Sequence, residues 1–314
     1  MNGQWINSLP RPIAFAFSGG ASLGAVQVGM LRALRTAGIQ PDLIVGTSVG
    51  ALNGAVIADR GLDAGIEQLT DLWTRTRCTD IFTGGTLDQL RCLLQTGQSL
   101  FRQDGLIKLI QEILGARRFE ALQLPLGVVA TELLSQRSTL FTQGELQSAL
   151  LASSAIPGLF PAVKINQRRH IDGCFSANVP LEAACQIGAA SIVVLDAGNR
   201  RRSSQTPQGL ANKVLAGVSA ALRKQVLVEA PRVAERLPLV YLPAPTLPPH
   251  RLMDFDASGA LIDRTASYVA RFLATAPSPA PGAMCGALHF CEVEPAEVAK
   301  FYDAPFEPAR AAFA

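Results

Sequence analysis

A short apolar run, Ile13–Phe17 (IAFAF), leads directly into the small-residue turn Ser18–Gly24 (SGGASLG). Apolar residues then recur at helical spacing from Leu23 to Ala37, and Gly38 ends that pattern. A strand that is apolar throughout is typical of a parallel sheet covered on both faces. This stretch therefore predicts a buried strand, a glycine turn and a helix, which is the repeating unit of an α/β protein.

The order of strand, glycine-containing turn and helix occurs again further along the chain. A second apolar run, Leu43–Val45, enters the turn Gly46–Gly50, and a helix is predicted over Ala51–Ala58. Further strands and helices alternate after it, which predicts an α/β fold with a mainly parallel sheet covered on both faces. The predicted strands are Gly127–Leu133, Ser138–Phe141, Val163–Ile171, Ser191–Asp196 and Leu239–Leu242; the predicted helices are Glu145–Ser153, Leu181–Ile187, Gly209–Ala230 and Ser258–Leu273.

Composition excludes several classes of protein. Of 314 residues, 48% are apolar and 17% charged, so the chain has enough apolar residues for a large core and is not intrinsically disordered. The 28 basic and 25 acidic residues leave a net charge of +3, which does not predict nucleic-acid binding. The six cysteines include no C-x-x-C pair, which argues against a structural zinc site. The start lacks signal-peptide features, and we expect a cytoplasmic protein.

The turn Gly46-Thr47-Ser48-Val49-Gly50 has the G-x-S-x-G pattern between a predicted strand and a predicted helix. In that setting a serine sits on a tight turn with its hydroxyl exposed above the sheet, and the helix N-terminus favours developing negative charge. The pattern alone is common, and an ordinary turn serine is the alternative. The strand–turn–helix context favours Ser48 as a nucleophile.

The turn Ser18–Gly24 lies at another predicted strand–helix junction. Successive small residues can leave their N–H groups free to point at one anion, either a phosphate or the oxyanion of an acyl-transfer reaction. A Walker loop would end in Gly-Lys-Ser/Thr, but Gly24 is followed by Ala25-Val26. The glycines also fall as G-G-x-x-x-G and not G-x-G-x-x-G, so nucleotide binding is disfavoured; a plain tight turn is the remaining alternative.

A base for the serine can be sought in two places. Asp172-Gly173 follows a predicted strand and offers a carboxylate, although Asp-Gly is also a common turn sequence. The order Ser, acid, His of an α/β-hydrolase would be met by Ser48, Asp196 and either His250 or His289. Only about two strands precede Ser48, however, which is too few for that fold.

Taken together, these motifs resemble the patatin-like phospholipases of the bacterial type. The resemblance spans residues 13–181 and is carried by four motifs in order, which is far more specific than any one of them. They are Ser18–Gly24, Gly46–Gly50, Ala152-Ser153-Ser154-Ala155-Ile156-Pro157-Gly158-Leu159-Phe160-Pro161 and Asp172-Gly173.

The resemblance implies a three-layer α/β/α sandwich and a Ser–Asp dyad without a catalytic histidine. Ser48 matches the nucleophile and Asp172 the general base, while Gly19, Gly20 and Ala21 match the oxyanion hole. The implied substrates are acyl esters of lipids, cleaved as by a phospholipase or lysophospholipase. The resemblance implies no cofactor and no metal.

Two positions depart from the family pattern. Leu23 stands where the family's glycine turn often carries Arg or Lys, so a charge that could assist the anion site is missing. Cys174 follows Asp172-Gly173, where the family usually has Gly or Ala. Cysteine is small enough to be tolerated there, but it could shift the carboxylate.

The sequence also predicts how the chain is divided into a domain and a tail. We expect an acyl hydrolase domain over residues 1–275, with residues 63–115 as a helical cap over the site. Pro277, Pro279 and Pro281 predict a linker at the start of a C-terminal tail, residues 276–314. Between Lys164 and Arg236 there are eleven basic and five acidic residues, which would attract anionic lipid headgroups unless they form an ordinary solvated loop.

Two other functions remain open at this point: a carboxylesterase for short-chain esters, or a catalytically weak membrane-binding or scaffold protein on the same fold. The presence of both Ser48 and Asp172 favours an enzyme.

Overall fold

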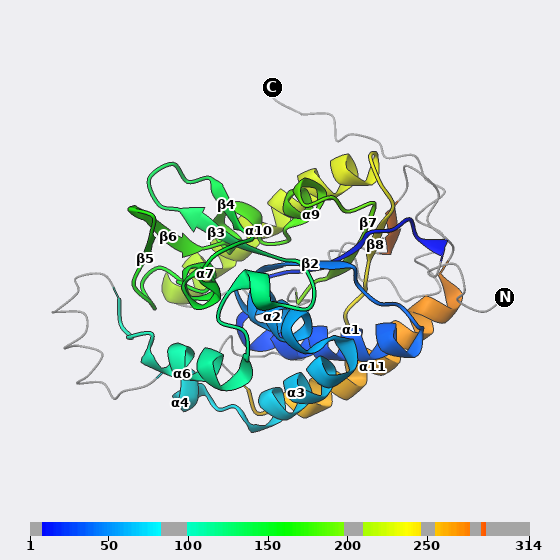
Figure 1. The fold of residues 1–314 in the computed structure, drawn as a ribbon, viewed down its shortest axis with the longest axis horizontal. Helices are drawn as coiled ribbons and strands as arrows, with labels where there is room; N and C mark the ends of the chain where they lie inside the picture. The colour runs from blue at the N-terminus through cyan, green and yellow to red at the C-terminus, as the bar shows by residue number, and fades with distance from the viewer. Residues whose placement is uncertain (1–7, 83–98, 198–209, 246–254, 277–283, 287–314) are drawn as a thin grey trace.

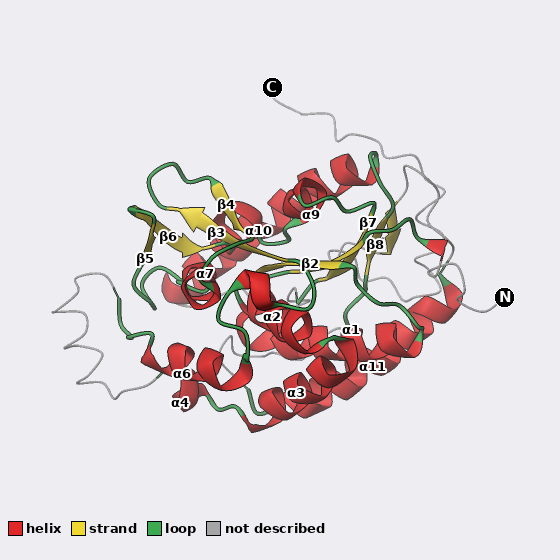
Figure 2. Cartoon of the chain, viewed as in Figure 1, coloured by secondary structure: helices red, strands yellow, loops and turns green. Residues whose placement is uncertain are grey.

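The structure, a computed structural model, describes residues 8–82, 99–197, 210–245, 255–276 and 284–286. Within them a nine-stranded mixed sheet runs through the middle of the molecule (Figure 1 and Figure 2). The strand order is β5-β6-β3-β2-β1-β7-β8-β9, with β4 paired to β3. The strands are β1 (Ile13–Phe17), β2 (Leu43–Thr47), β3 (Leu126–Glu132), β4 (Ser138–Phe141), β5 (Val163–Ile165), β6 (Arg168–Asp172), β7 (Ser191–Leu195), β8 (Leu239–Tyr241) and β9 (Met284–Gly286).

Most neighbouring strands are parallel. The run from β3 through β2, β1, β7 and β8 to β9 is parallel throughout, whereas β4, β5 and β6 join through antiparallel pairings. This confirms the predicted mainly parallel sheet.

Helices cover both faces of the sheet, which confirms the three-layer arrangement. On β1, Phe15 and Phe17 pack into the layer formed by α1, α2, α3 and α11, while Ala14 and Ala16 face the layer formed by α9 and α10. The central strands are therefore buried on both sides, which explains why their sequences are apolar throughout. These helices are α1 (Gly24–Thr36), α2 (Val49–Arg60), α3 (Leu62–Arg75), α9 (Leu181–Gln186), α10 (Leu210–Ala234) and α11 (Ser258–Thr275).

Shorter elements lie between these strands and helices along the chain. They are the 3₁₀ turns η2 (Ala21–Leu23) and η3 (Phe119–Ala121) and the helices α4 (Cys78–Ile81), α6 (Asp104–Ile113), α7 (Leu146–Ser153) and α8 (Cys174–Ala177). Among the described residues, no helix combines the length and apolar character needed to cross a bilayer.

The order of connections marks where a site is expected. The chain leaves β1 to form β2 on one side and later returns to place β7 on the other. In open α/β sheets, ligands bind at the carboxyl ends of the strands beside such a switch point. The turn Ser18–Gly24 starts at this point, and the turn at Ser48 follows the neighbouring strand.

Three predicted segments differ in detail. The predicted strand Val163–Ile171 is a hairpin of β5 and β6, because Asn166 and Gln167 adopt positive φ and turn the chain back. The predicted tail contributes β9, which pairs with β8, so the sheet extends beyond residue 275. Within the predicted cap, α3 packs against α1 and α2 as part of a layer, and residues 83–98 lie outside the described residues.

Candidate active site

Ser48 occupies a strained turn between β2 and α2. Its backbone has φ 55° and ψ −127°, in a region that residues with a side chain seldom adopt. Two close approaches explain its glycine neighbours. A Cβ on Gly50 would lie 2.4 Å from the carbonyl oxygen of Ser18, and one on Gly46 would lie 2.6 Å from the backbone of Ala51. The G-x-S-x-G pattern is therefore required by the packing of α2 against β1 and β2.

Asp172 reaches Ser48 from a distant part of the sequence. It ends β6, which runs antiparallel to β3 and pairs Asp172 with Ala130. The Ser48 hydroxyl donates a hydrogen bond of 2.7 Å to Asp172 Oδ2. The backbone N–H of Cys174 donates to the other carboxylate oxygen, Oδ1, at 2.9 Å. The structure thus brings together the two residues that the sequence predicts as nucleophile and base.

The environment of Asp172 sets its proton affinity. The side chain is 1% exposed, and this burial raises its pKa to about 6 because the charged form loses hydration. The hydrogen bonds from Ser48 and Cys174 act in the opposite direction, since they favour the carboxylate. Asp172 is therefore ionised near neutral pH, yet it is a stronger base than an exposed aspartate.

A buried serine holds both halves of the dyad together. The hydroxyl of Ser153 accepts the backbone N–H of Ser48 at 2.8 Å and donates to the carbonyl of Val129 at 2.6 Å. The Ser153 carbonyl accepts the N–H of Gly173, directly after Asp172. Ser153 lies within the motif Ala152–Pro161, but its sequence pattern predicted no role for it.

The glycine-rich turn differs in part from the prediction that its N–H groups are free. The N–H of Gly19 donates to the carbonyl of Asn178 at 3.0 Å, whereas no described hydrogen bond uses the N–H of Gly20 or Ala21. Gly20 is needed for space, because a Cβ there would lie 2.6 Å from the Cβ of Ala197. Ala21 has φ 49°. The N–H of Gly19 is therefore used within the fold, while those of Gly20 and Ala21 have no partner among the described hydrogen bonds.

Buried amides fix this turn from behind. Gln27 Nε2 donates to the carbonyls of Ser18 and Leu195, at the ends of β1 and β7. Asn53 Nδ2 donates to Gln27 Oε1, and the indole N–H of Trp73 donates to Asn53 Oδ1. A chain of hydrogen bonds therefore joins α3, α2 and α1 to the turn. The only sequence signal for it was an uncharged polar residue inside each of two largely apolar helices.

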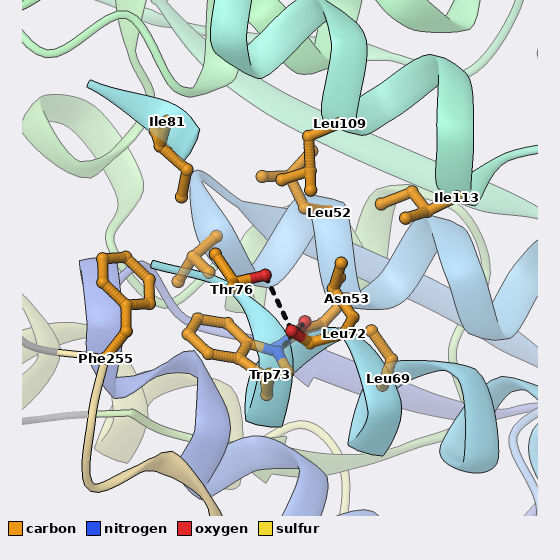
Figure 3. A pocket seen from close by; sticks show the side chains of 11 residues that line it. Leu52, Asn53, Leu69, Leu72, Trp73, Thr76, Ile81, Leu109, Ile113 and Phe255 are labelled. Atoms are coloured by element: carbon orange, nitrogen blue, oxygen red, sulfur yellow. Dashed lines mark hydrogen bonds between the residues drawn. The ribbon is translucent and has the colours of Figure 1, made fainter. Parts of the chain in front are cut away.

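An apolar pocket opens beside the nucleophile turn. Val49, which directly follows Ser48, lies at its wall, and the stacked rings of Trp73 and Phe255 lie on one side, with centroids 5.8 Å apart. The space, including its opening to solvent, is about 380 Å³. Figure 3 shows side chains from α2, α3, α4 and α6 converging on it. The lining residues are Val49, Leu52, Asn53, Leu69, Leu72, Trp73, Thr76, Ile81, Leu109, Ile113 and Phe255.

Comparison with known proteins shows which family the chain resembles. The family model described as "Patatin-like phospholipase" matches residues 15–185, from β1 through α9. This chain belongs to the patatin-like phospholipase family. The match includes the two strand–helix turns and the Asp172 segment.

Relatives of this patatin-like chain include much longer proteins. It is 31% identical over 199 residues to patatin-like phospholipase domain-containing protein 7 of Rattus norvegicus, covering 63% of this chain and 14% of that protein. It is 28% identical over 208 residues to neuropathy target esterase sws of Drosophila melanogaster, covering 66% of this chain and 14% of that protein. An NTE family protein of Mycobacterium bovis is 29% identical over 183 residues, with 58% and 48% covered.

Among solved structures, VipD from Legionella pneumophila is similar with a TM-score of 0.42 and 14% sequence identity, covering 84% of this chain and 67% of that one. The chain spans about a seventh of the length of the first two relatives.

The alternative triad finds no support in the described part of the patatin-like domain. Asp196 is buried and accepts a hydrogen bond of 2.5 Å from the hydroxyl of Tyr241, on the far side of β1 from Ser48. His250 and His289 lie outside the described residues. His170 is buried against Phe141, and burial lowers its pKa. Within the described ranges, His, Cys, Asp and Glu side chains nowhere form a group of three that could hold a metal ion.

Proposed function

We propose that this protein hydrolyses carboxylic esters of lipids, as a phospholipase or lysophospholipase, with Ser48 as nucleophile and Asp172 as general base. The observation that carries the proposal is the 2.7 Å hydrogen bond from a serine on a strained turn to a buried carboxylate. An activated nucleophile is recognised by a base within hydrogen-bond reach. Membership of the patatin-like phospholipase family supports lipid esters as the substrate class.

In this proposal the reaction has two halves. Ser48 Oγ attacks the acyl carbonyl carbon while its proton passes to Asp172 Oδ2. The carbonyl oxygen becomes an oxyanion, which the N–H groups of Gly20 and Ala21 stabilise. The proton then passes to the leaving alkoxide, which departs as the alcohol and leaves an acyl-enzyme. A water molecule attacks that ester while Asp172 takes its proton. The bond between the acyl carbon and Ser48 Oγ then breaks, Asp172 returns the proton to Ser48 Oγ, and the fatty acid is released.

We assign the acyl chain to the apolar pocket beside Val49. That pocket begins one residue from the nucleophile, and its walls are almost entirely hydrocarbon and aromatic rings. Burying methylene groups there would provide the apolar part of substrate binding. Leu109→Trp would fill the pocket from α6. We expect it to reduce hydrolysis of long-chain esters strongly while preserving hydrolysis of acetate esters.

The nucleophile is tested with a fluorophosphonate probe and a panel of lipid esters, on wild type and Ser48→Ala. Labelling of a single serine that disappears in Ser48→Ala, together with a loss of turnover of about 10⁶-fold, is expected. Unchanged labelling of Ser48→Ala would refute the assignment. A series of p-nitrophenyl esters separates a lipid hydrolase from a carboxylesterase for short-chain esters, because only the former prefers longer acyl chains.

Three cysteines in the described residues, Cys78, Cys174 and Cys185, are free thiols. These thiols support action in a reducing compartment such as the cytoplasm. We propose that the protein reaches its lipid substrate there through peripheral contact with a membrane.

A further inference from the structure

Two leucines at one turn of this molecule are unusually open to solvent. Leu134 is 92% exposed and Leu133 is 44% exposed, at the end of β3. Isolated exposed leucines are common, but adjacent ones at a protruding turn form an apolar tip. We call Leu133–Arg137, which joins β3 to β4, the β3–β4 tip.

This tip is held in a fixed shape. Glu132 lies beneath it, largely buried, and its carboxylate accepts the backbone N–H groups of Leu134 at 3.1 Å and Ser135 at 3.0 Å. The N–H of Leu133 donates to the carbonyl of Arg169 on β6 at 2.8 Å. The two leucine side chains are therefore presented by a backbone that is tied down on both sides.

Cations surround the apolar tip. Arg168 and Arg169 begin β6, Lys164 lies on the paired strand β5, and Arg137 ends the β3–β4 tip; all four are exposed. None of the four has an ion pair within the described residues, whereas arginines elsewhere, such as Arg32 and Arg236, do. The acidic residue next to these cations is Glu132, and its carboxylate accepts the backbone N–H groups of Leu134 and Ser135.

Both hairpin ends lie at the edge of the sheet that carries the dyad. Because Ala130 pairs with Asp172 and Leu133 follows three residues later, Leu134 lies roughly 13 Å beyond the dyad along β3. Figure 1 shows the two hairpins together at one end of the sheet. Phe175 on α8, three residues after Asp172, adds another exposed apolar side chain, at 43%. We call these hairpin ends and Phe175 the docking edge.

We infer that the docking edge binds an anionic lipid surface, with Leu133, Leu134 and Phe175 inserted among the acyl chains and the four cations against the headgroups. This rests on the proposed function, since it presents the dyad to its substrate. Apolar tips flanked by unpaired cations match the layering of a membrane interface, where apolar groups reach the acyl boundary and cations remain at the phosphates. The fixed backbone lowers the entropy cost of insertion.

The test measures sedimentation of the protein with vesicles of phosphatidylcholine, with and without phosphatidylserine. Ser48→Ala serves as the background so that no lipid is turned over. Arg168→Gln/Arg169→Gln is expected to weaken binding to phosphatidylserine vesicles by about fivefold per arginine. Leu133→Ser/Leu134→Ser is expected to weaken it by about tenfold or more.

Matched controls lie elsewhere on the surface. Leu227→Ser/Val228→Ser removes two exposed apolar side chains from α10, and Arg264→Gln/Arg271→Gln removes two exposed cations from α11. Both are expected to bind vesicles like the parent protein. The inference would be overturned if the controls lost as much vesicle binding as the docking-edge variants. It would also be overturned if the parent protein did not bind anionic vesicles.

A second assay separates this inference from the proposed function. The same surface variants are made with Ser48 intact, and their hydrolysis of a dissolved short-chain p-nitrophenyl ester is measured. Normal hydrolysis without vesicle binding refutes the docking edge alone. Vesicle binding that depends on the docking edge, without hydrolysis of any ester, supports the docking edge and refutes the proposed enzyme.

Discussion

Ser48 and Asp172 meet at one hydrogen bond but come from differently built halves of the sheet. Ser48 follows a parallel strand and leads into a helix, so its position is fixed by residues within a few places of it in the chain. Asp172 ends an antiparallel strand and is placed by the register between β3 and β6. The proposed nucleophile is thus set by local turn geometry, whereas the proposed base is set by a pairing between distant segments.

Substitutions on the two sides of the site should therefore act in different ways. A change at the nucleophile turn meets rigid backbone at once, because glycines there pack against β1. A change near Asp172 acts through the electrostatics of a buried carboxylate. Five predictions test the comparison, from the largest expected effect to the smallest.

Asp172→Asn removes the base while keeping its shape. We expect turnover to fall by about 10⁴-fold or more, because the amide cannot accept the serine proton. Stability should move in the opposite direction. The pKa of Asp172 is about 6 in the folded protein and near 3.9 when unfolded, so ionisation of this group opposes folding as pH rises from 4 through 6. The variant should therefore melt no lower than wild type at pH 8, measured by calorimetry.

The same pKa predicts the acid limb of wild-type activity. Because the base must be ionised, kcat/KM should rise as pH increases through about 6 and then level off. His170→Ala should leave this limb in place, since the His170 ring packs against Phe141 and no described hydrogen bond joins it to Ser48 or Asp172. A loss of activity in His170→Ala comparable to that in Asp172→Asn would refute the dyad.

Gly20→Ala tests the turn on the nucleophile side. The φ of Gly20 is 175°, which any residue can adopt, so the obstacle is the approach of Ala197. The added methyl group should displace the N–H donors from the oxyanion, lowering kcat by about 10² to 10³ with little change in KM. Ala197→Gly in the same protein returns the space and should restore much of kcat. A folded Gly20→Ala enzyme with normal kcat would contradict the role of this turn.

Ser153→Ala breaks the link between the two halves. It leaves the N–H of Ser48 and the carbonyl of Val129 unpaired, which costs about 1–3 kcal/mol of stability. Displacing the nucleophile should also lower kcat by roughly tenfold to a hundredfold with KM nearly unchanged. Ser154→Ala is the matched control, because that neighbouring buried hydroxyl has no hydrogen-bond partner within the described residues. Equal kinetic effects of the two variants would mean that Ser153 only packs.

The same comparison explains how far the sequence could predict this site. The Ser48 turn was predictable because a strand, two glycines and a helix encode it within a dozen residues. Asp172 could be selected only through its family resemblance, since its partner strand β3 begins more than forty residues earlier. Local pattern cannot specify such a register.

The sequence did not predict the roles of residues whose side chains form hydrogen bonds with groups far away in the chain. Ser153, Gln27 and Asn53 are ordinary in type, and only the packed structure shows which backbone groups their side chains satisfy. The prediction that Gly19 offers a free N–H was wrong for a similar reason. The carbonyl that engages it belongs to Asn178, far along the chain.

Cys174→Ala should have the smallest effect, and it tests the base side without touching the carboxylate. Its backbone N–H, which donates to Asp172 Oδ1, is retained in the variant. Only the thiol is lost. Burial and the neighbouring Asp172 raise the pKa of that thiol, so it stays protonated and can donate weakly to the carboxylate. Losing this donor should raise the pKa of the base.

We therefore expect the acid limb of the pH profile of Cys174→Ala to move upward by less than about one unit. At pH 8, where the base is ionised in either protein, kcat should stay within about threefold of wild type. Alanine is also one of the two residues, Gly and Ala, that the family resemblance leads us to expect at this position. A loss as large as that of Ser153→Ala would mean that Cys174 positions Asp172 through packing and not through its weak hydrogen bond. A downward shift of the acid limb would mean that burial by the thiol outweighs its donation.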